Sequence, residues 1–489
     1  MPLPNSPPTP LNNVVNPSFL SLQSHSAQDF AVIDPSTLNE ITRVSHMGSR
    51  ETNEAIEAAY EAQKIWGQTT PLSRSKLLKN WYNAIIANTD DLALIASMES
   101  GKPLLEAKGE VTYAADFIDF YAHEIMHSSG FLPSPSVSNH KLLAMKEPIG
   151  VCGIITPWNF PLAMITRKLG PCLAAGCTAV LKPAAETPLS ALALAKLAQS
   201  VGIPPGVINV IPVPNNEAAQ VGTVLTNHQY VRKISFTGST RIGKLLMQES
   251  AKTVKRLSLE LGGNAPLIVF HDADLEKAVK GLMTSKFRNT GQTCVCSNRI
   301  FVHASIYDSF AAKVVENVKK LRMGSPLEEG VNLGPLISSN ACDKTSDLVN
   351  DAVAKGATVL IGGERSNVGR NYYQATVLTN VNDTMRVSNE EIFGPVVPLF
   401  KFTTEDEVIE MANKTEAGLA GYFFSQDLSK VWRIAAALEC GMIGVNTGVI
   451  SIVQAPFGGV KQSGLGREGS FMGLEEYQET KMVCFGGLE

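Results

Sequence analysis

The chain has 489 residues, of which 44% are hydrophobic and 18% charged, and its formal net charge is -4. This length predicts two or three domains, and the composition is typical of a soluble globular protein. No basic excess supports a nucleic-acid partner, and no uninterrupted apolar stretch reaches the ~18 residues that a membrane span needs. Because the eight cysteines lack paired spacing, we expect a reducing compartment rather than a disulfide scaffold.

The first 26 residues are rich in Pro, Ser and Asn and contain no Lys or Arg, which predicts a loose arm. A mitochondrial presequence would be Arg-rich and amphipathic, and a secretory signal would have a positively charged start. We therefore expect a cytoplasmic protein.

The chain from residue 50 to 260 predicts helices followed by an alternation of strands and helices. Residues 50–125 carry apolar side chains at three-to-four spacing, as amphipathic helices do. Short apolar runs bounded by Gly or Pro then alternate with helical stretches, which favours a parallel sheet covered on both faces over a helical bundle. The expected strands are 151–158, 178–183, 206–212 and 233–239, and the expected helices are 163–174, 188–202 and 216–225.

A second α/β series follows the ELGG stretch at 260–263. Its expected strands are 299–303, 357–363, 396–402 and 441–448, and its expected helices are 305–321 and 405–414. Residues 123–150 read as extended segments with turns and are too short for a core of their own. We expect this segment to be an arm that pairs with another subunit.

Cys294 and Glu260 are the first candidates for chemistry. A thiol becomes a useful nucleophile when it is reachable and a base lies nearby, and Gly291 permits a tight turn that presents Cys294. Glu260 ends an apolar run just before two glycines, which places a candidate general base at a strand end. The plain alternatives are a small buried cysteine and a surface glutamate before a turn.

Other polar residues also follow expected strands. The amide of Asn159 is a candidate hydrogen-bond donor to an oxyanion, or else a turn or helix cap. Gly238, Ser239 and Gly243 mark a strand-to-helix turn, where backbone N–H groups and the helix dipole favour phosphate. Glu391, with Phe393 before a Gly-Pro turn, is a candidate ligand for ribose hydroxyls.

Seven motifs occur in one order along the chain: TPWNFP, KPA, FTGST, ELGG, GQTC, EEIFGP and PFGGVKQSG. This order resembles the aldehyde dehydrogenase superfamily from about residue 28 to the end. The stretches ITRKLGPCLAAGCTAVLKPA, SKFRNTGQTCVCSNR and SGLGREGS resemble the succinate-semialdehyde dehydrogenase branch. The resemblance implies a Rossmann-like cofactor domain, a second α/β catalytic domain and a small β oligomerisation arm.

The resemblance also implies the reaction, which is oxidation of succinic semialdehyde to succinate with reduction of NAD(P). Cys294 would form a thiohemiacetal and then a thioester, Asn159 and the Cys294 backbone N–H would hold the oxyanion, and Glu260 would activate water. The alternatives are another acidic semialdehyde such as glutaric semialdehyde, a cofactor-free acyl hydrolase, or a catalytically silent relative. No metal is implied.

For the cofactor, the resemblance implies that Lys182 binds the adenosine ribose, Ser239 a phosphate and Glu391 the nicotinamide ribose. Ala185 stands where many NAD-using relatives have a glutamate, and loss of that carboxylate removes repulsion against a 2′-phosphate. We therefore expect NADP, with NAD as the alternative because Glu186 is adjacent. The implied cofactor set is Thr156, Trp158, Lys182, Ala185, Gly238, Ser239, Gly243, Leu261, Glu391 and Phe393.

For the substrate carboxylate, the resemblance implies Arg167, Arg288 and a hydroxyl contact from Ser451. A guanidinium suits a carboxylate, although both arginines could instead pair with internal acids. Cys296 either packs or closes onto Cys294 as a reversible disulfide, as this branch of the superfamily can do.

The implied domain organisation has four parts. Residues 1–127 and 149–259 form the cofactor-binding domain, and residues 260–446 form the catalytic domain. Residues 128–148 and 475–489 form the oligomerisation arm, and residues 447–474 return to line the substrate site. We expect a homodimer or homotetramer that acts on a small molecule.

Overall fold

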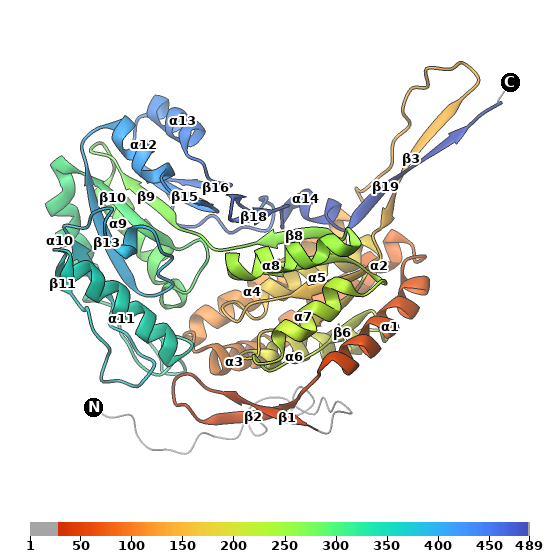
Figure 1. Cartoon of the computed structure of the whole chain (residues 1–489), viewed down its shortest axis with the longest axis horizontal. Coiled ribbons are helices and arrows are strands. Elements are labelled where there is room, and N and C mark those ends of the chain that lie inside the picture. Colours follow the sequence, from red (N-terminus) through yellow and green to blue (C-terminus); the bar gives the residue numbers. More distant parts are fainter. Residues whose placement is uncertain (1–27, 488–489) are drawn as a thin grey trace.

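The computed structural model describes residues 28–487 and contains two main β-sheets, each covered by helices (Figure 1). The first sheet has six strands in the order β18-β8-β7-β4-β5-β6. Its parallel strands are β4 (Val151–Ile155), β5 (Thr178–Lys182), β6 (Ile208–Val210), β7 (Val231–Thr237) and β8 (Arg256–Glu260). The short strand β18 (Gly464–Leu465) pairs antiparallel with β8 at one edge.

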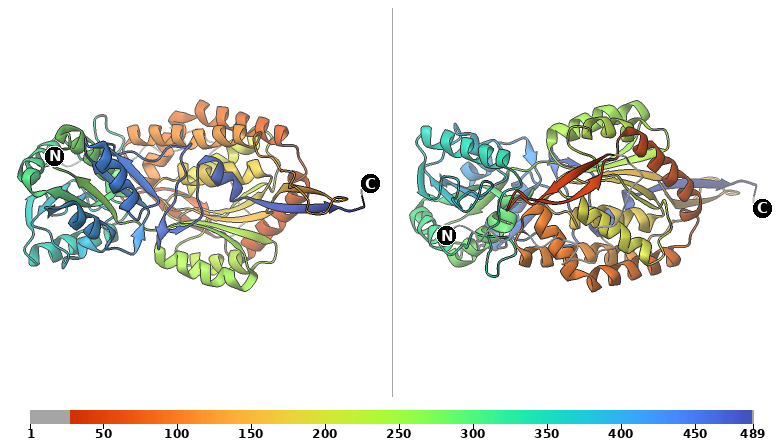
Figure 2. Two further views of the ribbon diagram at one scale, coloured as in Figure 1. Left: turned by 90° about the horizontal axis from the view of Figure 1, so that it is seen from above. Right: turned by 90° about the horizontal axis from the view of Figure 1, so that it is seen from below.

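Helices cover both faces of this first sheet, as the two views in Figure 2 show. One group contains α2 (Pro71–Ala87), α3 (Thr89–Ser100), α4 (Leu104–Glu124), α5 (Ala163–Ala175) and α6 (Pro188–Ser200). The other contains α1 (Ser49–Trp66), α7 (Ala218–Asn227) and α8 (Thr240–Ser250). Strands β4 and β5 are buried along nearly their whole length, as expected for a sheet covered on both sides.

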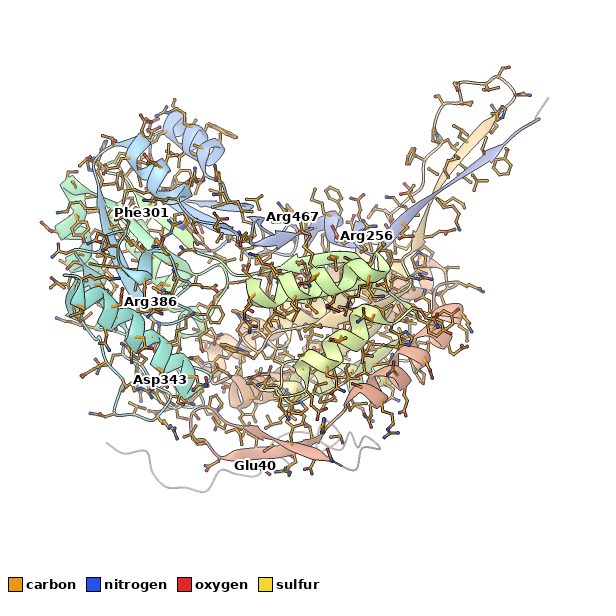
Figure 3. All side chains as sticks on the ribbon, viewed as in Figure 1. Glu40, Arg256, Phe301, Asp343, Arg386 and Arg467 are labelled. Atoms are coloured by element: carbon orange, nitrogen blue, oxygen red, sulfur yellow. The ribbon has the colours of Figure 1, made fainter. Side chains whose placement is uncertain are left out.

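The second sheet has seven strands in the order β11-β12-β13-β10-β9-β15-β16, and all pairs are parallel except the β11–β12 edge. Its strands are β9 (Ala265–Val269), β10 (Ser297–His303), β11 (Thr358–Ile361), β12 (Thr376–Thr379), β13 (Val396–Phe402), β15 (Ala420–Phe424) and β16 (Met442–Val445). Its helices are α9 (Leu275–Phe287), α10 (Tyr307–Val318), α11 (Ser339–Ala354), α12 (Glu405–Asn413) and α13 (Leu428–Ala437). Phe301, labelled in Figure 3, packs against Phe400 inside this sheet, with ring centroids 5.2 Å apart.

Three smaller pieces complete the fold. Strands β1 (Asp29–Ile33) and β2 (Glu40–Ser45) form an antiparallel hairpin, and β14 (Ala417–Gly418) pairs with β17 (Val460–Lys461). Strands β3 (Lys141–Pro148) and β19 (Gln478–Phe485) form an antiparallel ribbon that projects from the body in Figures 1 and 2. Helix α14 (Ser470–Glu475) precedes β19. Arg256, labelled in Figure 3, donates to the Gln478 carbonyl at 2.8 Å, which ties β8 to β19.

The predicted fold class is confirmed, since both sheets are predominantly parallel and lie between helices. The hairpin of β1 and β2 was not predicted, because its alternation of exposed and partly buried residues gives a weak apolar pattern. The helix expected at 305–321 is shorter, because a 3-10 turn at Ala304–Ile306 precedes α10. The loose arm expected at residues 1–26 lies outside the described residues. No helix between residues 28 and 487 is long and apolar enough to cross a bilayer.

Candidate active site

A cavity of about 300 Å³ lies where β4, β7 and β8 of the first sheet end, facing α11 and the loops that precede β10 and β13. The carboxyl ends of parallel strands meet at one edge, so residues that follow different strands converge there. Nine residues predicted from the sequence line this cavity: Trp158, Asn159, Gly238, Ser239, Glu260, Leu261, Cys294, Glu391 and Phe393.

The loop before Cys294 has an unusual backbone. Asn289 and Thr290 have φ angles of 49° and 56°, and Gly291 has a φ of 79°. A side chain on Gly291 would overlap the carbonyl of Gly394, so both the backbone angle and the space require glycine. Left-handed conformations at Asn and Thr cost free energy and concentrate at functional loops, which fits a loop that presents a nucleophile.

Cys294 and Glu260 are neighbours inside the cavity. Burial, followed by the nearby Glu260 carboxylate, raises the pKa of the Cys294 thiol well above its ordinary value. The thiol is therefore protonated at neutral pH, and its use as a nucleophile requires a base. Glu260 is 2% exposed, and its Oε1 atom has no hydrogen-bond partner within residues 28–487. This oxygen is available to accept a proton.

A close backbone contact joins Gly263 to the candidate nucleophile Cys294. Gly263 lies next to the backbone of Cys294, and a Cβ atom on Gly263 would overlap the Cys294 carbonyl oxygen. The second glycine of the ELGG motif is therefore required by space rather than by its backbone angle.

Asn159 is buried beside the nucleophile loop. Its Nδ2 donates to the Gln292 carbonyl at 3.0 Å, and its backbone carbonyl accepts from Lys102 at 2.8 Å and from Asn289 at 2.9 Å. One of the two Nδ2 hydrogens is engaged by Gln292, so the second is the one that an oxyanion would use.

Arg167 forms two buried ion pairs with internal acids. It is 1% exposed, its Nη2 donates to Glu260 Oε2 at 3.0 Å, and its Nε lies 2.5 Å from Glu468 Oε2. Its guanidinium also stacks over the Phe457 ring at 4.1 Å, and Lys168 pairs with the other oxygen of Glu468. The alternative considered for Arg167, pairing with internal acids, is therefore present in this structure, and one of these acids is the candidate base.

Arg288 differs from Arg167 in its surroundings. Its guanidinium carbon lies 5.1 Å from the centre of the Phe160 ring, and no ion pair involves it among residues 28–487. Ser451 is half-buried in the loop after β16 and does not line the 300 Å³ cavity. The buried thiols of Cys294 and Cys296 are not bonded to each other, and Cys296 Sγ lies 3.6 Å from the Lys286 and Ser297 carbonyls.

Glu391 and Phe393 close one side of the cavity. Glu391 Oε1 accepts from the Gly263 N–H at 3.2 Å, and desolvation raises the pKa of Glu391 to about 7. Phe393 meets Trp158 edge to face, with ring centroids 5.6 Å apart and an interplanar angle of 88°. A carboxylate beside two aromatic walls suits the ribose and ring of a nucleotide.

The start of α8 provides a place for phosphate. Ser239 is the N-cap of this 11-residue helix, and Gly243 contacts Leu261 so closely that a Cβ would overlap the leucine side chain. The hydroxyl oxygens of Thr156 and Thr237 are buried and have no hydrogen-bond partner within residues 28–487. A helix N-terminus next to unsatisfied hydroxyls fits the pyrophosphate of a dinucleotide cofactor.

The adenosine end of the predicted cofactor site lies near a second cavity of about 480 Å³ that Ala185 and Glu186 help to line. Burial lowers the pKa of Lys182 to about 8, while the charge of Glu186 opposes that shift. The Glu186 carboxylate accepts from Asn215 Nδ2 at 2.8 Å, so it already has a partner.

Two lysines of the site were missed by sequence reasoning. Lys344 from α11 lines the 300 Å³ cavity, and its Nζ donates to the Glu391 carbonyl at 2.6 Å. Lys102, which precedes α4, contacts Asn159 from a loop 57 residues upstream. Neither lysine lies in a recognisable motif, and only the fold brings them to the site. No group of His, Cys, Asp and Glu between residues 28 and 487 is arranged to hold a metal ion.

Comparisons with known proteins identify relatives that match nearly the whole chain. The human mitochondrial succinate-semialdehyde dehydrogenase is 52% identical over 464 residues, which cover 95% of this chain and 87% of that protein. The 3-sulfolactaldehyde dehydrogenase of Pseudomonas putida is 51% identical over 471 residues, covering 96% of both chains.

Two solved structures are similarly close. The succinate-semialdehyde dehydrogenase of Burkholderia pseudomallei has a TM-score of 0.93 at 52% identity, covering 94% of this chain and 95% of that one. An NADP-dependent enzyme of E. coli has a TM-score of 0.92 at 51% identity, with the same coverage. The model of the aldehyde dehydrogenase family matches residues 22–483. With its cysteine, glutamate and asparagine gathered in one cavity, this chain belongs to the aldehyde dehydrogenase family.

Proposed function

We propose that this protein oxidises succinic semialdehyde to succinate and reduces NADP. The observation that carries this proposal is the single cavity in which Cys294, Glu260 and Asn159 meet the residues suited to a dinucleotide. The 52% identity to succinate-semialdehyde dehydrogenases supports the choice of substrate.

In the proposed reaction, Cys294 Sγ attacks the aldehyde carbon while its proton moves to a carboxylate oxygen of Glu260. The second Nδ2 hydrogen of Asn159 and the Cys294 N–H hold the oxyanion of the thiohemiacetal. Trp158, Ser239, Glu391 and Phe393 would hold a nicotinamide cofactor, which would supply the hydride acceptor needed to convert the thiohemiacetal into a thioester. After losing its proton to solvent, Glu260 takes a proton from water, and the hydroxide attacks the thioester and displaces the Cys294 thiolate.

For the substrate carboxylate we propose Arg288 as the principal ligand, together with Arg167 and the Ser451 hydroxyl. Arg288 lies six residues before the nucleophile, as the resemblance implies, and no carboxylate of the described chain pairs with it. Arg167 would have to share its guanidinium among the substrate, Glu260 and Glu468. The two arginines therefore differ in how accessible they are to an incoming anion.

A second candidate substrate is 3-sulfolactaldehyde, because a dehydrogenase named for it is 51% identical to this chain. Its sulfonate is also an anion that a guanidinium can bind, so Arg288 would serve either compound. Glutaric semialdehyde differs from succinic semialdehyde by one methylene, which a pocket distinguishes by only ~1–3 kcal/mol.

The proposed preference for NADP rests on Ala185. The neighbouring Glu186 is engaged by Asn215, which supports a site without a carboxylate at the adenine ribose. The NADP-dependent E. coli enzyme that resembles this chain is in keeping with this choice. Replacement of Ala185 by Glu is expected to shift the ratio of kcat/KM values towards NAD, and an unchanged ratio would contradict the assignment.

We propose that the ribbon of β3 and β19 joins subunits in a homodimer or homotetramer. The ribbon projects from the body, and Met482 and Phe485 on β19 are 61% and 48% exposed. Apolar side chains on a two-stranded ribbon with unpaired edges favour pairing with another chain. Sedimentation velocity compares the oligomeric state of the full chain with that of a variant lacking residues 481–489, and so measures how far the ribbon holds subunits together. A cytoplasmic location stays a prediction, which cell fractionation can check against the mitochondrial relatives.

The function is tested by steady-state kinetics that follow reduced nicotinamide. Succinic semialdehyde, 3-sulfolactaldehyde, glutaric semialdehyde and uncharged butyraldehyde are each supplied with NADP and with NAD. The expected result is the highest kcat/KM for succinic semialdehyde with NADP. Equal use of butyraldehyde would reduce the proposal to a general aldehyde dehydrogenase, and preference for 3-sulfolactaldehyde would select the second candidate.

A further inference from the structure

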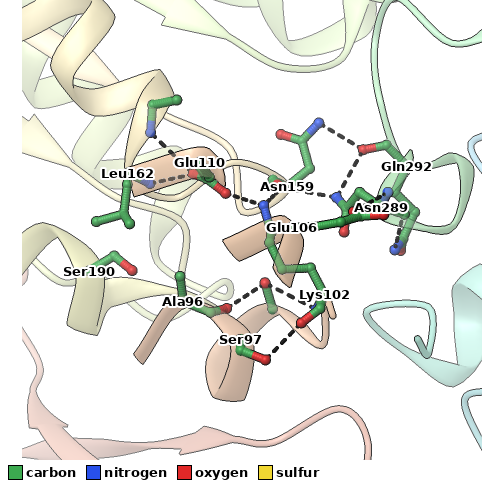
Figure 4. A network of polar contacts seen from close by, with 12 residues as sticks. Ala96, Ser97, Lys102, Glu106, Glu110, Asn159, Leu162, Ser190, Asn289 and Gln292 are labelled. Atoms are coloured by element: carbon green, nitrogen blue, oxygen red, sulfur yellow. Dashed lines mark hydrogen bonds and ion pairs between the residues drawn. The ribbon is translucent and has the colours of Figure 1, made fainter. Parts of the chain in front are cut away.

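Lys102 is a buried lysine outside the residues that touch the cavity. It lies between α3 and α4, is 1% exposed, and pairs with the equally buried Glu110. The same amine donates to the Asn159 backbone carbonyl at 2.8 Å (Figure 4). It also lies 4.1 Å from the centre of the Phe160 ring. The side-chain amine of Lys102 therefore contacts Glu110, the Asn159 carbonyl and the Phe160 ring.

Glu110 extends this contact to the next helix. Its other carboxylate oxygen accepts the backbone N–H groups of Leu162 at 2.8 Å and Ala163 at 3.1 Å, at the start of α5 (Figure 4). A carboxylate there is favoured by the helix dipole and satisfies two donors that lack partners inside the helix. The Lys102–Glu110 pair thus holds both ends of the short segment from Asn159 to Ala163.

The loop before Cys294 also contacts the segment from Asn159 to Ala163. Asn289 Nδ2 donates to the Asn159 carbonyl that Lys102 also contacts, and the Asn289 N–H donates to Glu106 Oε2 at 2.7 Å. The Asn159 side chain in turn donates to the carbonyl of Gln292, two residues before Cys294. Figure 4 shows these contacts as one network that runs from Lys102 to Gln292.

We propose that Lys102 is a positioning residue for the oxyanion-binding amide of Asn159, an inference that rests on the proposed reaction. It fixes the backbone carbonyl at the base of the Asn159 side chain and so sets where the second Nδ2 hydrogen lies relative to Cys294. Hydrogen-bond donors stabilise an oxyanion only when they are already in place, so a displaced amide loses its effect. A lysine that merely stabilised the fold would not act on the oxyanion selectively.

Two reactions of Cys294 distinguish a positioning role of Lys102 from a purely structural one, and they need neither the natural substrate nor a cofactor. Acylation by p-nitrophenyl acetate passes through an oxyanion, whereas alkylation by iodoacetamide does not, and mass spectrometry of the Cys294 peptide follows each. In Lys102→Met we expect the acylation rate constant to fall about 100-fold, the scale for a misplaced catalytic group, with alkylation little changed. Asn159→Ala should show the same pattern, and adding Lys102→Met to it should have little further effect.

Lys233→Met is the matched control, because Lys233 is 0% exposed and pairs with Glu476 at 3.1 Å, away from Asn159. It should leave the ratio of acylation to alkylation at the wild-type value. Lys102→Met leaves the buried Glu110 carboxylate without its ion-pair partner. The double variant Lys102→Met/Glu110→Gln removes this charge as well, and thermal unfolding checks that it is folded.

Equal losses in acylation and alkylation, the same selective loss in Lys233→Met, or additive effects of Lys102→Met and Asn159→Ala would each overturn the proposal. Because p-nitrophenyl acetate needs neither aldehyde nor nicotinamide, a wrong substrate assignment would leave this outcome unaffected.

Discussion

Replacement of Arg288 by Ala tests how this protein selects an anionic aldehyde. Arg288 forms no ion pair within residues 28–487, although its charge favours the ionised form of the partly buried Glu106 and partly opposes the rise in its pKa that burial causes. A charge-assisted hydrogen bond to a carboxylate contributes about 1.5–3 kcal/mol. Since 1.36 kcal/mol corresponds to tenfold in rate, kcat/KM for succinic semialdehyde should fall roughly 10- to 150-fold. For butyraldehyde it should stay near the wild-type value.

Arg167→Ala should behave differently, because Arg167 holds Glu260 and Glu468 through buried ion pairs. Removing one partner of a buried pair costs about 3–5 kcal/mol, and here it also releases the base from its position. We therefore expect kcat to fall for both aldehydes and the thermal unfolding temperature to drop. The assay is steady-state kinetics with succinic semialdehyde and butyraldehyde, which both have four carbons. For Arg288, the variant Arg288→Lys is assayed as well, because lysine keeps the charge but lacks the planar guanidinium.

An equal fall in kcat/KM for both aldehydes in Arg288→Ala would contradict the proposed role, because Arg288 would then act on the fold or on Cys294. A fall in kcat for the acidic aldehyde alone in Arg167→Ala would contradict the expectation for Arg167. In that case its pairing with Glu260 would have no catalytic consequence.

Three further predictions follow from the site. Because burial lowers the pKa of Lys182 to about 8, its amine is charged below that pH and neutral above it. NADP binding, measured by fluorescence titration, should weaken between pH 7 and 9.5, and Lys182→Arg should abolish this dependence. Gly263→Ala should lower activity by about 100-fold, since its Cβ would displace the backbone of Cys294. Gly109→Ala is the control, because a Cβ there meets nothing within 4 Å, and equal losses in both would refute the steric argument. If Cys294 and Cys296 form a reversible disulfide, treatment with mild peroxide should lower the mass by two hydrogens, as measured by mass spectrometry. Dithiothreitol should then restore activity. The Cys296→Ala variant should show neither effect.

The sequence by itself determined the fold class and the central chemistry of this protein. Apolar runs after residue 151 alternate with helical stretches, and a parallel sheet is the physical consequence of that pattern. Residues that follow parallel strands meet at one edge of the sheet, so the cavity at the ends of β4, β7 and β8 contains Asn159, Ser239 and Glu260. Short motifs predict these positions because the turn after each strand depends on residues that are close in the sequence.

Only the tertiary structure decided which buried charged and polar groups meet. Lys102 contacts Asn159 across 57 residues, and Arg167 contacts Glu260 across 93. No local pattern specifies such pairs, because a buried charge needs a polar or oppositely charged partner, and only the fold brings distant residues together. The sequence therefore predicted the candidate reacting groups, and the three-dimensional packing determined how Asn159 and Glu260 are held.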